Sequence, residues 1–270
     1  MYLLKKFGDV FLKALAVGDV CSLGACEFLL KRLPVLKKEL GADLVIVNGE
    51  NSAENNGITK NSAELIFAAG ADVITGGNHT LRNKEIYSYL DENPFILRPD
   101  NIKSEYGSGY CLIDKGRFSA AVINLCGCIF MDRCEADNFI LAADELIKKV
   151  KADGAKYIFI DFHAEATSEK KALGFYLDGK VSAVFGTHTH IMTADSQILP
   201  QGTGYITDLG MTGPENSVLG VKTDIIINRI KNKDMSKFEF AEGKNILCGC
   251  VFECDDSGLC KSVKPIIDRE

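Results

Sequence analysis

All four histidines of the chain fall within three short polar stretches. These stretches are Gly76-Gly77-Asn78-His79, Asp161-Phe162-His163 and Gly186-Thr187-His188-Thr189-His190. Each follows a run of apolar, β-type residues, and two further runs of this kind end in Gly18-Asp19 and Gly49-Glu50-Asn51. Imidazole, carboxylate and amide groups are ligands that a pair of transition-metal ions takes in proteins. The pattern therefore predicts a paired metal site built from five strand ends.

Asp19 and Glu50 are the carboxylates of this set. Gly18 lets the backbone turn sharply after a buried strand, which leaves Asp19 free to bind a cation. The alternative is an acid at the N-terminus of the next helix. Asp9 follows a glycine too, but no buried strand precedes it, so we prefer Asp19. Glu50 could bridge two ions through its two oxygens, although an isolated Glu-Asn pair would fit a solvated loop better.

The amide oxygens of Asn51 and Asn78 are neutral, hard ligands, and the imidazole of His79 could face a substrate instead of a metal. A lone histidine is more often structural, but an asparagine at a glycine-rich strand end favours a functional role. In extended backbone, residues i and i+2 project to the same side. We therefore expect the rings of His188 and His190 to lie together, which suits two neighbouring ions or one shared ion.

A ligand set of oxygen and imidazole without thiolate suits Fe, Mn, Zn or Co. A water shared by two such ions loses its proton near neutral pH, and the hydroxide is a nucleophile for phosphorus. The alkoxide that leaves needs a proton, for which His79 is the spare imidazole. The sequence thus predicts metal-dependent hydrolysis of a phosphate ester.

The bulk composition is that of a globular protein: 46% of the 270 residues are hydrophobic and 25% are charged. The formal net charge of −6 argues against strong nucleic-acid binding through a broad basic surface. No apolar run is long enough to span a membrane, and no signal-peptide pattern opens the chain. We expect a cytoplasmic protein with no membrane partner.

Ten cysteines are spread over the chain without any Cys-x-x-Cys pair. Cys248, Cys250 and Cys254 would share one face of a strand, where free cysteine packs as a small apolar residue. A thiolate metal site is the alternative, but zinc sites usually show closer paired spacing. In a reducing compartment the thiols should be free.

Apolar runs alternate with helical stretches, which predicts an α/β sandwich of two mixed sheets flanked by helices (α/β/β/α). We expect helices over 23–40, with a kink at Pro34, and over 61–69, 83–90 and 136–152. Strands are expected over 14–17, 44–47, 73–75, 109–113, 119–124, 157–160, 181–185 and 204–207. The tail from 237 to 267 should form antiparallel strands joined by a turn over 255–258. In open α/β sheets ligands bind beyond the carboxyl ends of the strands, where the polar stretches lie.

The motifs resemble those of the calcineurin-like metallophosphoesterases, which carry Gly-Asn-His and Gly-His-x-His. This chain has Gly77-Asn78-His79 and, nearly, Gly186-Thr187-His188-Thr189-His190. It departs at Asp19-Val20-Cys21, which lacks a histidine, and at Gly49-Glu50-Asn51, where glutamate replaces aspartate. Both departures resemble the YmdB-like phosphodiesterases, as do the stretches 47–53, 161–170 and 205–214.

The resemblance implies a single metallophosphoesterase domain over residues 1–270, with an N-terminal extension over 1–13, that hydrolyses 2′,3′-cyclic nucleotides. It implies that one ion is held by Asp19, Glu50, Asn51 and His190, and the other by Glu50, Asn78, His163 and His188. It makes Glu50 the bridge and His79 the proton donor. Iron is the expected metal, with manganese or zinc as alternatives, and a homo-oligomer is expected.

Two other functions remain open at this point. A regulatory or RNA-associated protein could carry the metals for structure, although the acidic charge weakens direct RNA binding. A non-haem di-iron redox protein usually gathers carboxylates on helices, whereas imidazoles and amides on loops dominate here.

Overall fold

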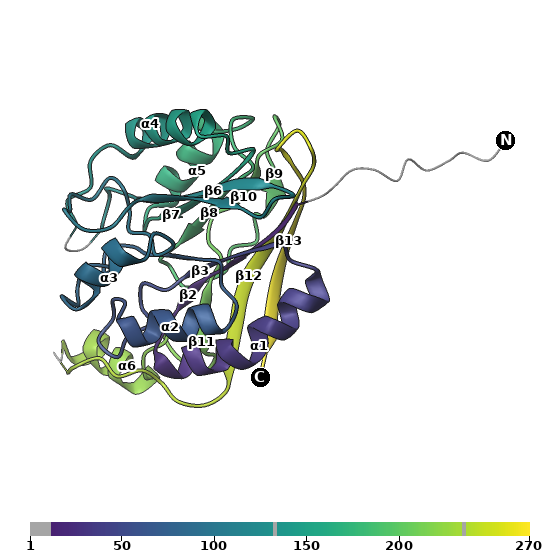
Figure 1. Cartoon of the computed structure of the whole chain (residues 1–270). Helices are drawn as coiled ribbons and strands as arrows, with labels where there is room; N and C mark the ends of the chain where they lie inside the picture. The colour runs from purple at the N-terminus through teal and green to yellow at the C-terminus, as the bar shows by residue number, and fades with distance from the viewer. Residues whose placement is uncertain (1–11, 132–133, 234–235) are drawn as a thin grey trace.

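The computed structural model describes residues 12–131, 134–233 and 236–270. Two β-sheets lie face to face between two layers of helices, with α4 and α5 on one outer side and α1 and α2 on the other (Figure 1). The expected α/β/β/α sandwich of two mixed sheets is therefore confirmed. No helix in the described part of the chain is long and apolar enough to cross a membrane.

The first sheet has the strand order β2-β11-β12-β1-β3-β4, and β13 also pairs with β12. Its neighbours β1, β3 and β4 run parallel, whereas β12 is antiparallel to β1. The strands are β1 (Leu12–Val17), β2 (Asp19–Val20), β3 (Leu44–Asn48), β4 (Val73–Thr75), β11 (Met211–Pro214), β12 (Asn245–Cys254) and β13 (Cys260–Arg269).

The second sheet has the order β5-β6-β7-β8-β10-β9. Strands β6, β7, β8 and β10 are parallel, and the antiparallel strands β5 and β9 form its edges. The strands are β5 (Tyr110–Asp114), β6 (Ser119–Cys126), β7 (Tyr157–His163), β8 (Ala183–Thr187), β9 (Gln197–Ile198) and β10 (Gly204–Ile206).

Three helices begin where a side chain accepts free N–H groups of the first turn. Ser22 caps α1 (Leu23–Leu40), which continues through Pro34, and Thr59 caps α2 (Lys60–Ala68) in a reciprocal pair with Ser62. Asn138 accepts from the N–H groups of Ile140 and Leu141, so α4 (Phe139–Ala152) begins three residues later than expected. The third helix, α3 (Ile86–Glu92), also begins later than expected.

Successive side chains of β1 point to opposite faces of the first sheet, and they belong to separate core clusters. Ala14 and Ala16 face the second sheet, in a cluster that includes Phe159, Phe185 and Phe252. Leu15 and Val17 face α1 and α2, in a separate cluster. A third cluster packs α4 and α5 against the outer face of the second sheet. Both faces of the inner strands are thus buried, which holds their carboxyl ends in fixed positions.

Several elements differ from the sequence-based expectation. Strand β1 begins at Leu12, so residues 12 and 13 belong to the sheet, while Asp9 and the rest of the expected extension lie outside the described residues. The tail hairpin is present as β12 and β13. Two helices were not expected, α5 (Thr167–Tyr176) and α6 (Thr223–Asn232). Gly174 interrupts the helical sequence pattern of α5. The ring of Tyr205 packs against the helix there, and a Cβ at position 174 would lie only 2.5 Å from that ring.

Cys250 and Cys254 are buried in the core between the sheets, together with Cys260 of β13. All ten cysteines are free. Burial raises the pKa of the Cys111 thiol to about 12 and of the Cys248 thiol to about 11, so these thiols stay protonated. This agrees with the expected packing role.

Candidate metal centre

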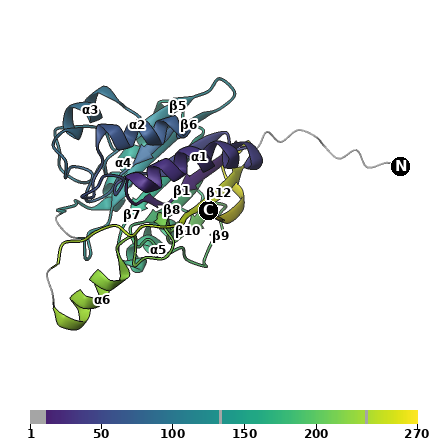
Figure 2. The same cartoon turned by 90° about the horizontal axis from the view of Figure 1, so that it is seen from below.

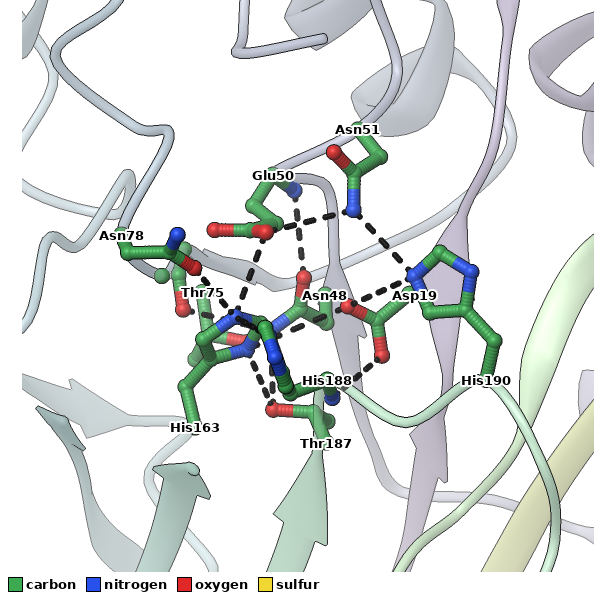
Figure 3. Close-up of polar contacts among 12 residues, drawn as sticks. Asp19, Asn48, Glu50, Asn51, Thr75, Asn78, His163, Thr187, His188 and His190 are labelled. Atoms are coloured by element: carbon green, nitrogen blue, oxygen red, sulfur yellow. Dashed lines mark hydrogen bonds and ion pairs between the residues drawn. The ribbon is translucent and has the colours of Figure 1, made fainter. Parts of the chain in front are cut away.

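The polar stretches meet at one edge of the two sheets, because the parallel strands of both sheets end there. Asp19 follows β1, Glu50 and Asn51 follow β3, and Asn78 and His79 follow β4 in the first sheet. From the second sheet, His163 ends β7, and His188 and His190 follow β8. Polar contacts connect all eight side chains that the sequence singled out, and Figure 3 labels seven of them.

The first cluster surrounds His163 Nε2. This atom lies 3.1 Å from Asn78 Oδ1, 3.1 Å from His188 Nδ1 and 3.2 Å from Glu50 Oε1. Two atoms that bind one ion at about 2.1 Å lie roughly 3.0–3.4 Å apart, so these separations fit one coordination shell. Among the described residues, Glu50, His163 and His188 also form the one group of three titratable side chains whose ligand atoms lie within 4.8 Å of one another.

The second cluster lies on the other side of Glu50 and is looser. The amide nitrogen of Asn51 is 3.2 Å from Glu50 Oε1 and 3.3 Å from His190 Nε2. His190 Nε2 is in turn 3.7 Å from Asp19 Oδ1. That oxygen is buried and has no hydrogen-bond partner among the described residues. A buried carboxylate oxygen without a partner is costly, and a cation would satisfy it.

The pKa values of Glu50 and Asp19 show that nearby positive charge stabilises both buried carboxylates. Burial alone would raise the pKa of Glu50, but the charge and hydrogen bond of His163 hold it well below its usual range. Burial would lower the pKa of His163, yet the charge of Glu50 raises it to about 9. For Asp19, burial would raise the pKa, but the nearby His190 outweighs it, and the pKa is lowered. Bound cations could replace the protons that these histidines carry.

His188 behaves differently from its neighbours. Burial and the charge of His163 lower the pKa of His188 to about 3, so its ring is neutral and able to bind a metal. Its Nε2 atom lies 3.2 Å from Glu165 Oε2, and its backbone N–H donates to Asp19 Oδ2 at 3.1 Å. The chain therefore links the two clusters through the backbone of His188.

The segment that carries His188 and His190 is not extended, contrary to the sequence-based expectation. Strand β8 ends at Thr187, and both histidines have positive φ, 102° for His188 and 63° for His190. The rings consequently serve different clusters, His188 beside His163 and His190 beside Asp19 and Asn51. Positive φ is rare for residues with a Cβ and is concentrated at functional sites.

A hydrogen-bond relay behind His163 was not assigned from the sequence. Thr187 Oγ1 lies 2.9 Å from His163 Nδ1 and donates to Asp161 Oδ1 at 2.7 Å. Asp161 also accepts from Asn48 Nδ2 at 3.0 Å. Such contacts fix the orientation of a ligating imidazole. The sequence did carry a signal, since Asp161 lies two residues before His163 and hence on the same face of β7.

Lys170 of α5 is a second feature that the sequence did not reveal. Its ammonium group is buried, 2.7 Å from Asp208 Oδ2, and donates to the carbonyl oxygen of Thr187 at 2.8 Å. The same Asp208 oxygen accepts the backbone N–H of Thr189 at 3.0 Å. This ion pair therefore holds the backbone on both sides of His188 in place.

Replacing Lys170 by methionine is expected to lower the free energy of unfolding by about 3–5 kcal/mol, because the buried charge of Asp208 loses its partner. Urea denaturation measures this. Lys171→Met is the matched control, since Lys171 makes a partly exposed ion pair with Asp195 that should contribute no more than about 1 kcal/mol. Equal losses in the two variants would contradict this role of Lys170.

A cavity of about 650 Å³ opens directly over the clusters. Its polar lining includes Glu50, Asn51, His79, Glu165, His188 and His190. Two cationic side chains, Arg82 and Lys237, line it as well. The volume lies within the range of small-molecule sites, about 300–1,000 Å³. A ligand in this cavity would touch the candidate ligands and His79 at the same time.

His79 lies between the clusters and the cavity. Its Nδ1 atom is 3.2 Å from Glu50 Oε1 and 3.3 Å from Asn51 Oδ1, and its backbone N–H donates to Glu50 Oε2 at 3.0 Å. Only 20% of its side chain is exposed. The ring is thus oriented by the neighbouring carboxylate, in a position suited to a proton transfer.

The chain is similar to known proteins in sequence and in fold. The chain is 45% identical over 246 residues to the 2′,3′-cyclic-nucleotide 2′-phosphodiesterase of Bacillus subtilis, covering 91% of this chain and 92% of that protein. Its fold matches the crystal structure of a novel phosphatase from Mycoplasma pneumoniae with a TM-score of 0.91 and 31% identity, over 97% and 95% of the two chains. A hypothetical protein from Thermus thermophilus matches with a TM-score of 0.88 and 35% identity, over 96% and 100%.

The family of the chain is given by a match that covers nearly the whole fold, including the strands that position the two clusters. The sequence model of the YmdB-like protein family matches residues 15–266. That range begins in β1, before Asp19, and ends in β13, so it contains all eight side chains described above. The chain belongs to the YmdB-like protein family.

Proposed function

We propose that the protein is a dinuclear metal-dependent phosphodiesterase that hydrolyses 2′,3′-cyclic nucleotides. The observation that carries the proposal is the convergence of oxygen and imidazole ligands on both sides of Glu50, beneath a cavity of about 650 Å³. The activity for which the Bacillus subtilis relative is named supports the substrate class. The fold alone would not, because one fold supports many activities.

We assign one ion to Glu50, Asn78, His163 and His188, and the other to Asp19, Glu50, Asn51 and His190. Glu50 Oε1 contacts members of both clusters, which suits a bridging ligand. The unpartnered oxygen of Asp19 fits a cation in the second cluster. With no thiolate among the assigned ligands, iron suits the site, and manganese or zinc are the alternatives.

When bound, the ions supply a hydroxide nucleophile near neutral pH and offset the negative charge that develops on the phosphate oxygens. The residues of the chain do the rest. Glu50 orients the ring of His79 over the cavity, and His79 protonates the ribose oxygen that leaves. Arg82 and Lys237 favour an anionic substrate at the cavity.

The ten free cysteines are suited to a reducing compartment, which favours the cytoplasm as the place of action. The expected substrate is a small nucleotide there. The net charge of −6 does not favour long nucleic acids as partners.

The proposal is tested by purifying the protein without added metal and measuring metal content and turnover of 2′,3′-cyclic AMP on the same sample. We expect two transition-metal ions per chain, turnover that a chelator abolishes, and recovery when iron or manganese is restored. Metal-loaded protein that leaves every cyclic nucleotide intact would contradict the proposal and favour a regulatory role with structural metals.

Gly77 offers a separate test of the ligand geometry. A Cβ at this position would overlap Glu50 Oε2 and the imidazole ring of His163, both far inside van der Waals contact. Gly77→Ala must therefore displace two assigned ligands, and we expect its metal content to fall below half that of the wild type by elemental analysis. Gly24→Ala is the control, because its Cβ would meet only Ser22 Oγ, at 3.7 Å. Unchanged metal content in Gly77→Ala would contradict the assignment.

A further inference from the structure

Part of the cavity lining is not used by the metal chemistry. It consists of four apolar side chains, Leu219, Val221, Phe238 and Phe240. All four come from one segment, residues 215–244, which connects β11 to β12 and contains α6. We call these four residues the apolar wall. Figure 2 shows α6 standing out from the two-sheet body.

The apolar wall is tied to the site by backbone hydrogen bonds. Val221 and Phe240 form an antiparallel bridge, and the N–H of Ala241 donates to the carbonyl oxygen of Gly220 at 2.8 Å. The carbonyl oxygen of Leu219 lies 3.1 Å from His190 Nδ1. Leu219 itself has a φ of 55°, which bends the chain at this contact. The wall therefore has a fixed position relative to the second cluster.

Phe238 is the most accessible aromatic group of this wall. Its side chain is 52% exposed although it lines a cavity, and the guanidinium carbon of Arg229 lies 4.1 Å from its ring centroid. A cation over an aromatic ring covers one of its faces. An exposed ring in a cavity, supported from one side, is suited to stack against a flat ligand.

The two kinds of cavity lining match the two ends of a nucleotide. The phosphate end suits the candidate metal ligands, and a nucleobase is a flat group that stacks on aromatic side chains. We propose that the apolar wall is the nucleobase subsite of the enzyme, with Phe238 as the stacking residue, and that it favours purine nucleotides. A purine covers more of the ring than a pyrimidine does. This inference rests on the proposed function and names the specificity determinant of the same site.

Kinetics with two substrates test the subsite. One is 2′,3′-cyclic AMP, and the other is methyl riboside 2′,3′-cyclic phosphate, which carries the same cyclic phosphate without a base. Stacking of one base corresponds to a preference of about 10- to 100-fold. We expect Phe238→Ala to raise KM for 2′,3′-cyclic AMP by about 10-fold or more with little change in kcat. The base-free substrate should be cleaved equally well by the variant and the wild type.

Phe175→Ala is the matched control, because Phe175 is 56% exposed on α5 with Lys171 over its ring but does not line the cavity. It should leave both substrates unaffected. If the wild type cleaves both substrates with equal kcat/KM, the nucleobase subsite is wrong while the proposed function stands. If the wild type cleaves neither substrate, the proposed function fails, and the binding measurement described next is then the test of the subsite.

Binding can be followed directly because the chain contains no tryptophan. Phe238→Trp places a single fluorophore in the apolar wall, and Phe175→Trp places one outside the cavity. We expect 3′-AMP to quench the fluorescence of the first variant and not of the second, while ribose 3-phosphate quenches neither. Equal responses of Phe238→Trp to the nucleotide and to the sugar phosphate would overturn the subsite.

Discussion

His79→Asn is expected to slow the hydrolysis of 2′,3′-cyclic AMP by about 100-fold or more while leaving the metal content unchanged. Asparagine can keep a polar contact with Glu50 Oε1, now made by His79 Nδ1 at 3.2 Å, but it cannot donate a catalytic proton. The loss should fall on kcat more than on KM, because the proton is needed when the ribose oxygen leaves. Steady-state kinetics and elemental analysis of the same preparation measure both parts.

The choice of leaving group separates a proton donor from a structural residue. p-Nitrophenolate leaves as a stable anion that needs no proton. His79→Asn should therefore hydrolyse a p-nitrophenyl phosphate ester nearly as fast as the wild type does. A loss of equal size on both substrates would show that His79 acts in some other way. Loss of metal from the variant would likewise contradict the assignment.

Glu50→Gln is expected to slow the hydrolysis of 2′,3′-cyclic AMP at least as much as His79→Asn does, but for a different reason. Glu50 Oε1 contacts His163 and Asn51, which belong to separate clusters, so one substitution removes a negatively charged ligand from both proposed ions. We expect fewer than half of the wild-type ions to remain. The rate should fall by more than the roughly 10²–10³-fold that follows removal of one preorganised electrostatic group.

The control for this variant is Glu64→Gln, on the exposed face of α2, where Glu64 pairs with Lys60 at 3.9 Å. It should keep full metal content and activity. Chelator-treated wild type should match Glu50→Gln in rate, and added metal should restore the wild type only. A variant that binds two ions and turns over normally would show that Glu50 is not the bridge.

Much of the fold was predictable because its strands are buried on both faces. Runs such as Leu44–Val47 and Tyr157–Ile160 are apolar and are followed directly by polar residues, so the strands and the location of the site could both be read from the sequence. Helix α6 could not be predicted in this way, because none of its residues is buried and no apolar face is required of it. Strand β2 has only two residues and depends on pairing with β11.

The site was predictable as a set of residues but not as a geometry. The ligand types at strand ends indicated which side chains converge. The positive φ values of His188 and His190 depend on contacts with Asp19 and Leu219, which are distant in sequence. Lys170 and Phe238 could not be found because nothing in their local sequence distinguishes them from ordinary surface residues.

The proposed mechanism requires that seven residues distant in sequence surround two metal ions beside a catalytic histidine. Anomalous diffraction at a metal absorption edge, from crystals of protein purified without added metal, locates such ions directly. We expect two peaks, one among Glu50, Asn78, His163 and His188 and the other among Asp19, Glu50, Asn51 and His190. A single peak, or peaks away from these side chains in a protein that still hydrolyses cyclic nucleotides, would contradict the dinuclear assignment.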